Sequence, residues 1–453
     1  MVWNVRSKAR APRHTWAAWL RDSCRAVKQS SAWLTTLVFV SVGFSILHAD
    51  NAELLTLREA RLRVLKENPD LASAQAQVLA ALAEVRRART WANPVLTAST
   101  AHIATDGSGN GAGMGNRFFD RSYDSIWSLS QLIETGGKRG LRHSAASAGV
   151  KSAQAQADDV RRQLLEAVDR AYIAAVEANQ EASTVAETAH SLRAEANIAA
   201  HRVDAGDVSL ADKSQLEIAA GQRELDADSA RATAISALIT LQILLAERNP
   251  DGHLRLSENL HDLLPKVDAL ENLSMAGLRP DLAAAEADAQ KSELDLREQR
   301  RERVPDITLG IQYERNPPDL DNTVGVSVSL PLPIFDRNAA GIDAARAARE
   351  QAVARLAKTQ IQTAADVASA RIAALEARAR AQRYQDELGP KSASVLKSIE
   401  FSYRRGGNSL LELLAAERDD RDIRVAQLRA EADYAEAAVS LLSALNRIGV
   451  ETR

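Results

Sequence analysis

The feature that most constrains the fold of this chain is that one structural plan occurs twice. The segment NPDLASAQAQVLAALAEVRRARTWANPVLTAST, from Asn68, aligns with RPDLAAAEADAQKSELDLREQRRERVPDITLGI, from Arg279. Two further pairs follow in the same order: SLSQLIETGGKRG with SVSLPLPIFDRNA, and RVDAGDVSLADKSQLE with SYRRGGNSLLELLAAE. Three ordered blocks indicate an internal duplication. We divide the chain into a first repeat at residues 50–250, a connecting segment at 251–278, a second repeat at 279–449 and a tail at 450–453.

Each repeat predicts the same succession of elements: helix, strand, loop, strand, very long helix, tight turn and long helix. In the first repeat we expect a helix over 54–91, strands over 94–104 and 124–134 flanking the glycine-rich stretch 106–116, and helices over 140–203 and onward to 247. In the second repeat we expect 280–303, 305–315, 322–332, 341–405 and 408–447, with a kink at Gly389-Pro390. The predicted fold class is mainly α with a small β part, built on duplicated long helical hairpins.

The strands of the second repeat alternate between apolar and polar residues. Ile307, Leu309 and Ile311 share one face, and Val324, Val326 and Val328 share one face of the next strand. Such a face packs on a helix or faces lipid. Strands of about ten residues suffice to cross an outer membrane when tilted, but four strands cannot close a barrel, since small barrels need about eight. The membrane interpretation therefore requires several copies to share one barrel.

The N-terminal residues predict export. The first 30 residues carry seven basic side chains and one acid, and the apolar run AWLTTLVFVSVGFSILHA at 32–49 follows them. This order is typical of a secretory signal peptide, which we assign to 1–49, with a single membrane anchor as the alternative. Removing it changes the net charge from −3 to −9, which argues against a nucleic-acid partner. The only cysteine, Cys24, lies inside the segment removed.

With these features in place, the sequence resembles the TolC-like outer membrane efflux protein family. The motifs QLIETGGKRGLR at 131–142 and PLPIFDRNAAGI at 331–342 resemble its CzcC-like branch, the outer membrane component of heavy-metal cation RND tripartite efflux systems. The resemblance implies a homotrimer whose twelve strands form one barrel in outer membrane lipid, above a periplasmic α-helical tunnel. It also implies a periplasmic adaptor and an inner-membrane RND pump as partners, no cofactor, and export of cations such as Co, Zn, Cd, Ni, Cu or Ag.

The same resemblance implies that the turns at 203–210 and 403–410 are periplasmic tips that contact the adaptor and narrow to a gate. Gly206 and Gly406 suit tight turns that reverse a helix. Tyr403, Leu411 and Arg418 match family positions that line or brace the tip.

An acidic residue is often found in the family where this chain has Ala415. Glu412 or Asp212 could supply an acidic group nearby, or both are ordinary solvated charges.

At the other end of the long helices, the strands give way to helices. We expect Gly136 and Gly137 in one repeat, and Pro331 and Pro333 in the other, to end the strand ladder at a membrane-to-periplasm junction. The neighbouring Lys138, Arg139 and Arg142 lie at the membrane surface or are simply solvated.

No residue pattern indicates catalysis or a dedicated metal site. The histidines after the signal have no metal-ligand spacing, and TGGKRG lacks the spacing of a phosphate-binding loop. We therefore predict a channel and not an enzyme. The alternatives are a channel for drug efflux or type I protein secretion and, in another class, a periplasmic adaptor or coiled-coil scaffold without a channel.

Overall fold

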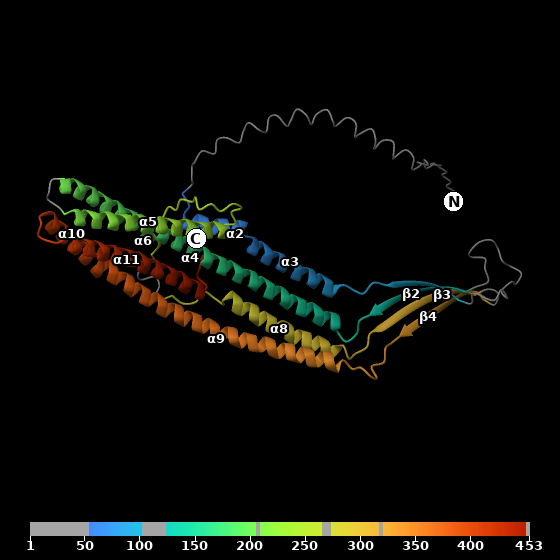
Figure 1. The fold of residues 1–453 in the computed structure, drawn as a ribbon. Helices are drawn as coiled ribbons and strands as arrows, with labels where there is room; N and C mark the ends of the chain where they lie inside the picture. Colours follow the sequence, from blue (N-terminus) through green and yellow to red (C-terminus); the bar gives the residue numbers. More distant parts are fainter. Residues whose placement is uncertain (1–53, 102–123, 205–208, 265–272, 317–319, 450–453) are drawn as a thin grey trace, which may run out of the picture. The chain divides into compact units, whose positions relative to one another are not determined.

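The computed structural model describes residues 54–101, 124–204, 209–264, 273–316 and 320–449, and all of these except Leu54 belong to one unit, Leu55–Arg453. The predicted signal peptide, the glycine-rich stretch, Gly206 and the tail lie outside the described residues. Figure 1 shows long helices side by side, with a small sheet where α3, α4, α8 and α9 reach their ends. The predicted fold class, mainly helical with four antiparallel strands, is confirmed.

The first helix differs from the prediction. Instead of one helix over 54–91, the chain forms α2, Leu57–Glu67, and α3, Pro69–Arg89. Asn68 separates them in an extended conformation, and its side chain accepts a hydrogen bond from the Asp70 N–H at 2.8 Å. Proline disfavours helical geometry in the residue before it but suits the first position of a new helix. The sequence Asn-Pro-Asp therefore ends one helix and begins another.

The four strands form one antiparallel sheet in the order β1-β2-β3-β4. They are β1, Val95–Ala101; β2, Asp124–Ile133; β3, Ile307–Asn316; and β4, Leu320–Ser329. The last strand ends before Pro331, not at residue 332 as predicted, because proline has no N–H to donate to the ladder. The pairing of β2 with β3 joins the two repeats.

The register places the apolar residues in rows across one face. One row runs Leu96, Leu129, Ile311 and Val326, and the row beside it runs Thr97, Ser128, Gln312 and Gly325. The members of the apolar row are between 50% and 85% exposed. A helix of the same chain therefore does not cover this face in the described residues, and the alternative in which the sheet packs on a helix is wrong there.

The long helices follow the predicted plan with shifted ends. They are α4, Lys138–Asp204; α5, Leu210–Leu244; α8, Pro280–Arg301; α9, Ala339–Arg383; α10, Gly389–Arg404; and α11, Leu410–Ala444. The predicted kink occurs as a π-helical turn, Tyr384–Leu388, in which the Gly389 N–H donates to the Tyr384 carbonyl. Pro390 cannot continue the normal hydrogen-bond ladder, so the turn widens just before it.

α4 is the helix on which most of the others pack. It contacts α3 and α8 along the half nearer the sheet, and α5 and α11 along the other half (Figure 1), while α9 packs on α8 and α11. At mid-length the fully buried Tyr172 directs its hydroxyl to the Leu55 carbonyl oxygen at 2.8 Å and to the Glu258 carboxylate. Asp169, also buried, binds Arg61 through two contacts of 2.6 Å. These contacts hold α2 and the connecting segment, which contains α6, Leu260–Leu263, against α4.

Candidate functional site

The turn between α10 and α11 reverses the chain through a glycine. Gly406 has φ +76°, its N–H donates to the Tyr403 carbonyl at 2.9 Å, and the Gly407 N–H donates to the Ser402 carbonyl at 2.9 Å. This pair of bonds is a Schellman motif, which needs a left-handed residue where Gly406 stands. Gly406 therefore adopts the left-handed conformation that this tight turn requires.

The acidic residue expected near this turn has a local partner. The Ser409 hydroxyl accepts a hydrogen bond from the Glu412 N–H at 3.3 Å, and the Glu412 carboxylate accepts one from the Ser409 N–H at 2.8 Å. These bonds lower the pKa of the exposed Glu412 carboxyl. Asp212 stands in the first turn of α5, where its N–H donates to the Ser209 hydroxyl at 3.1 Å. Both repeats therefore begin the returning helix with a serine cap.

The ends of the two hairpins pack on each other through one apolar cluster. It draws on three helices, and its buried members are Leu192, Ala196, Ala199, Leu216, Ala220, Leu410 and Leu413. Tyr403 packs against this cluster, and burial raises the pKa of its hydroxyl. The sequence prediction that Tyr403 braces this end is consistent with that position.

The other two residues singled out from the family resemblance do not join the hairpins within the chain. Leu411 is 75% exposed, and among the described residues Arg418 pairs with Asp422 on its own helix, at 3.9 Å. Beside the apolar cluster, an ion pair between the hairpins comes from Arg404, whose guanidinium lies 3.4 Å from Glu195 of α4 and also pairs with Glu400. Sequence analysis missed this pair, because nothing local marks an arginine whose partner lies on another helix.

Glu417 is the second residue that sequence analysis missed as a site. One of its carboxylate oxygens is buried and has no hydrogen-bond partner among the described residues. Burial, together with the negative charges of Glu195 and Glu400, raises the pKa of this carboxyl to about 7. Its repeat equivalent, Glu217, is exposed and lies 3.6 Å from Lys213. The hairpin end thus contains a carboxyl that titrates near neutral pH.

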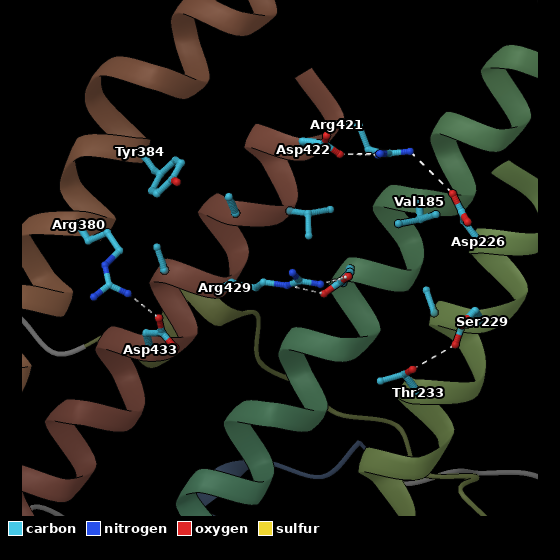
Figure 2. A pocket seen from close by; sticks show the side chains of 15 residues that line it. Val185, Asp226, Ser229, Thr233, Arg380, Tyr384, Arg421, Asp422, Arg429 and Asp433 are labelled. Atoms are coloured by element: carbon cyan, nitrogen blue, oxygen red, sulfur yellow. Dashed lines mark hydrogen bonds and ion pairs between the residues drawn. The ribbon is translucent and has the colours of Figure 1, made fainter. Parts of the chain in front are cut away.

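A charged groove of about 580 Å³ crosses the helices further from the turn. Figure 2 shows its walls: α9 and the π turn on one side, α11 and α4 in the middle, and α5 on the other side. Arg429 binds Glu181 at 2.7 Å, and Arg380 binds Asp433 at 3.0 Å. Nearly every charge in the groove has an opposite partner, so the groove is a wetted ionic surface with no free acid and base aimed at one point.

The groups that could hold a metal do not converge. In the ranges that the structure describes, no three histidine, cysteine, aspartate or glutamate side chains come together as a ligand set. The described helices carry oppositely charged pairs such as Arg429–Glu181 and Arg193–Glu224 along their surfaces.

At the sheet end, the two predicted junctions differ in how they turn. Gly136 and Gly137 have φ values of +65° and +72°, and a Cβ on Gly136 would stand 3.2 Å from the Cβ of Val304. Pro331 and Pro333 instead follow the end of β4 in an exposed segment. One repeat turns through left-handed glycines and the other through prolines that cannot pair.

The basic residues beside the glycines are mostly engaged within the chain. Lys138 is buried between Glu302 at 3.2 Å and Asp306 at 3.1 Å, and Arg142 binds Glu134 at 2.6 Å. Arg139 lies over the ring of Trp91, 3.8 Å from its centre. Simple solvation is therefore wrong for Lys138, which fixes α4 to the start of β3.

None of the described helices is both long enough and apolar enough to cross a membrane.

Comparison with known proteins identifies a family and two similar resistance proteins. A family model described as "Outer membrane efflux protein" matches residues 62–247 and 274–447. The cobalt-zinc-cadmium resistance protein CzcC of Cupriavidus metallidurans is 26% identical over 320 residues, 70% of this chain and 75% of that protein. The nickel-cobalt-cadmium resistance protein NccC of Alcaligenes xylosoxydans xylosoxydans is 25% identical over 290 residues, 64% of this chain and 63% of that protein.

Among solved structures, the Campylobacter jejuni CmeC outer membrane channel superposes with a TM-score of 0.72 at 18% identity, covering 86% of this chain and 85% of that one. At this identity the likeness establishes the fold.

Proposed function

Because this chain belongs to the outer membrane efflux protein family, we propose that it is the outer-membrane exit duct of a tripartite pump that exports heavy-metal cations. The sheet is the observation that best supports this proposal. It has two unpaired edges, β1 and β4, and an exposed apolar face, so several copies pairing β1 with β4 would make a closed barrel with that face towards lipid.

The helices support the same assembly. α5 packs mainly on α4, which leaves it at one edge of the helical layer, and α9 lies at the other edge. Both carry exposed apolar side chains, which are Leu210, Ile218, Leu225 and Ile243 on α5, and Val353, Ile361, Ile372 and Leu375 on α9. Contiguous exposed apolar surface marks association sites, so edge-to-edge contact between copies would bury both rows. We propose the homotrimer of twelve strands that the family resemblance implies.

The substrate class rests on the relatives. The names of CzcC and NccC record resistance to cobalt with zinc, nickel or cadmium, and the first of these relatives is matched over most of its length. A duct needs no metal ligands of its own, because the pump that loads it selects the substrate. We therefore propose divalent transition-metal cations as the cargo, with an inner-membrane RND pump and a periplasmic adaptor as the partners.

We also propose that the hairpin ends form the periplasmic gate and adaptor contact, and that 1–49 directs export. The Arg404–Glu195 contact supports the gate, since it is the ion pair that ties one hairpin to the other beside the apolar cluster. Opening the tip would separate these hairpins. Arg404→Ala is then expected to raise channel opening several-fold, whereas Arg418→Ala, which removes only a contact within α11, should leave it unchanged.

Two measurements test the proposed function. The full chain purified in detergent is expected to be a trimer and to conduct ions in planar bilayers, and a monomer without conductance would refute the duct. A deletion strain is expected to lose tolerance to Co, Zn, Cd or Ni salts while keeping its tolerance to drugs. Loss of drug tolerance alone would instead favour the small-molecule efflux alternative.

A further inference from the structure

All four strands connect to helices or loops at the same edge of the sheet. This edge is the one formed by the strand termini, not by the outer strands β1 and β4. The strands are antiparallel, and the pairs Gln131↔Leu309 and Thr308↔Ser329 place the starts of β1 and β3 beside the ends of β2 and β4. The C-termini of α3 and α8, the start of α4 and the segment 330–338 therefore meet there (Figure 1). In the proposed duct this edge marks the level where the sheet leaves the membrane.

This edge carries a surplus of arginine. Six exposed arginines have no ion pair within the described residues; they are Arg86, Arg89, Arg300, Arg301, Arg303 and Arg337. The acids around them are already engaged: Glu134 with Arg142, Glu302 and Asp306 with Lys138, and Glu84 with Arg87. Asp336 remains and accepts a hydrogen bond from the Asn338 N–H at 2.8 Å. The positive charge at this edge is thus not neutralised by the chain itself.

Helix chemistry explains only part of this surplus. Basic residues in a last helical turn interact favourably with the helix dipole, which accounts for the arginines at the ends of α3 and α8. Arg303 and Arg337 lie beyond the helices and gain nothing from a dipole. The arginine surplus therefore needs a cause that acts on the whole edge and not on single helices.

Large apolar side chains are exposed at the same level. Phe335 is fully exposed, and Trp91 and Ile334 are more than half exposed. In water such exposure is unfavourable, but aromatic side chains at a membrane interface place the ring among acyl chains, and arginines there keep their guanidinium at the phosphates. At this edge, several unpaired arginines and exposed aromatic residues lie at one level, as they do at a phospholipid headgroup layer.

We propose that these six arginines with Trp91 and Phe335, the interfacial belt, bind anionic phospholipid headgroups in the leaflet that faces the helices. The inference rests on the proposed function, since it requires the sheet to span the outer membrane. Each arginine near an anionic surface favours association by roughly fivefold, and salt screens this attraction. A trimer would carry the belt as a closed ring.

Spin-labelled lipids measure the proposal directly. The full chain is reconstituted in phosphatidylcholine vesicles, and the association of labelled phosphatidylglycerol is compared with that of labelled phosphatidylcholine at the protein surface. The wild type is expected to prefer phosphatidylglycerol several-fold at low salt, and high salt should remove the preference. The combined variant Arg86→Gln, Arg89→Gln, Arg300→Gln and Arg301→Gln should lose most of the preference.

Two matched variants complete the experiment. Replacing the same four arginines by lysine keeps the charge and should keep the preference. Four exposed arginines away from the sheet serve as a control when changed to glutamine, and they are Arg161, Arg231, Arg248 and Arg383. Equal association of the two lipids with a wild-type protein that conducts would overturn the belt alone. A protein that conducts in neither lipid would overturn the duct, and the belt with it.

Discussion

Changing Glu417 to glutamine is expected to stabilise this protein at neutral and alkaline pH. The Glu417 carboxyl is half buried in α11, one of its oxygens is unpartnered, and Glu195 and Glu400 add negative charge around it. Ionising this group in the folded protein is therefore unfavourable. Glutamine has nearly the same shape and no charge.

The size of this stabilisation follows from the change in the pKa of the Glu417 carboxyl on folding. The pKa of the Glu417 carboxyl rises from 4.5 to about 7 on folding, and one pKa unit corresponds to about 1.4 kcal/mol. The folded state therefore holds the proton more tightly than the unfolded state, so stability is greatest below pH 4.5 and falls as the pH rises to about 7. The full shift would give about 3 kcal/mol, and partial access of solvent reduces this to about 1–3 kcal/mol.

Thermal unfolding followed by circular dichroism at pH 4.5 and pH 8 measures the effect. The wild type should lose thermal stability between the two values, and Glu417→Gln should lose several degrees less. Glu177, whose pKa burial and neighbouring acids also raise to about 7, should account for part of the remaining slope. The repeat equivalent Glu217 is exposed and 3.6 Å from Lys213, so the matched variant Glu217→Gln should not reproduce the gain in thermal stability at pH 8. A Glu417→Gln slope equal to that of the wild type would refute the reasoning.

Three further changes have defined outcomes. Leu413→Ala removes a side chain that is 1% exposed at the hairpin end, and it should lower the free energy of unfolding by about 2–4 kcal/mol. Denaturant titration measures this loss. The matched change Leu411→Ala, at an exposed position, should lower the free energy of unfolding by under about 0.5 kcal/mol. Val326→Arg places a charge on the apolar face of β4 and should reduce insertion into vesicles, by about 2–4 kcal/mol, as scored by heat-modifiable gel mobility. Tyr172→Phe deletes a hydroxyl that contacts Leu55 and Glu258, and it should lower the free energy of unfolding by about 1–3 kcal/mol. It should also accelerate proteolysis before α2. Unchanged cleavage would contradict the role of Tyr172 in holding this segment against α4.

Much of the fold could be predicted because its signals are local. The alternation in β3 and β4 fixes which residues share a face, and the observed register keeps Leu309 opposite Val328 and Ile311 opposite Val326. Gly406 predicts its turn because a left-handed residue is needed there. The break at Asn68 was also readable, since Asn-Pro-Asp is a helix start, but the predicted helix over 54–91 ran through it.

The candidate site was less predictable because its members meet through packing. The family resemblance singled out Arg418, yet Arg418 pairs within α11, and it is Arg404 that pairs with Glu195 of the other hairpin beside the apolar cluster. The basic run after Gly137 suggested a membrane surface, yet Lys138 is buried against two acids and the unpaired arginines come from α3, α8 and the loops.

Comparison of the two repeats distinguishes what the sequence determines from what the tertiary structure determines. By itself the sequence determined that two copies of one hairpin exist, with Leu210 and Glu217 in one where Leu410 and Glu417 stand in the other. Only the tertiary structure decided that Leu410 is 7% exposed and Leu210 68%, and that Glu417 is half buried while Glu217 keeps a lysine beside it. Identical residues in matching turns acquire different burial and charge because those properties depend on α4, whose contacting residues lie about 200 positions from Glu417 in the chain and next to it in space.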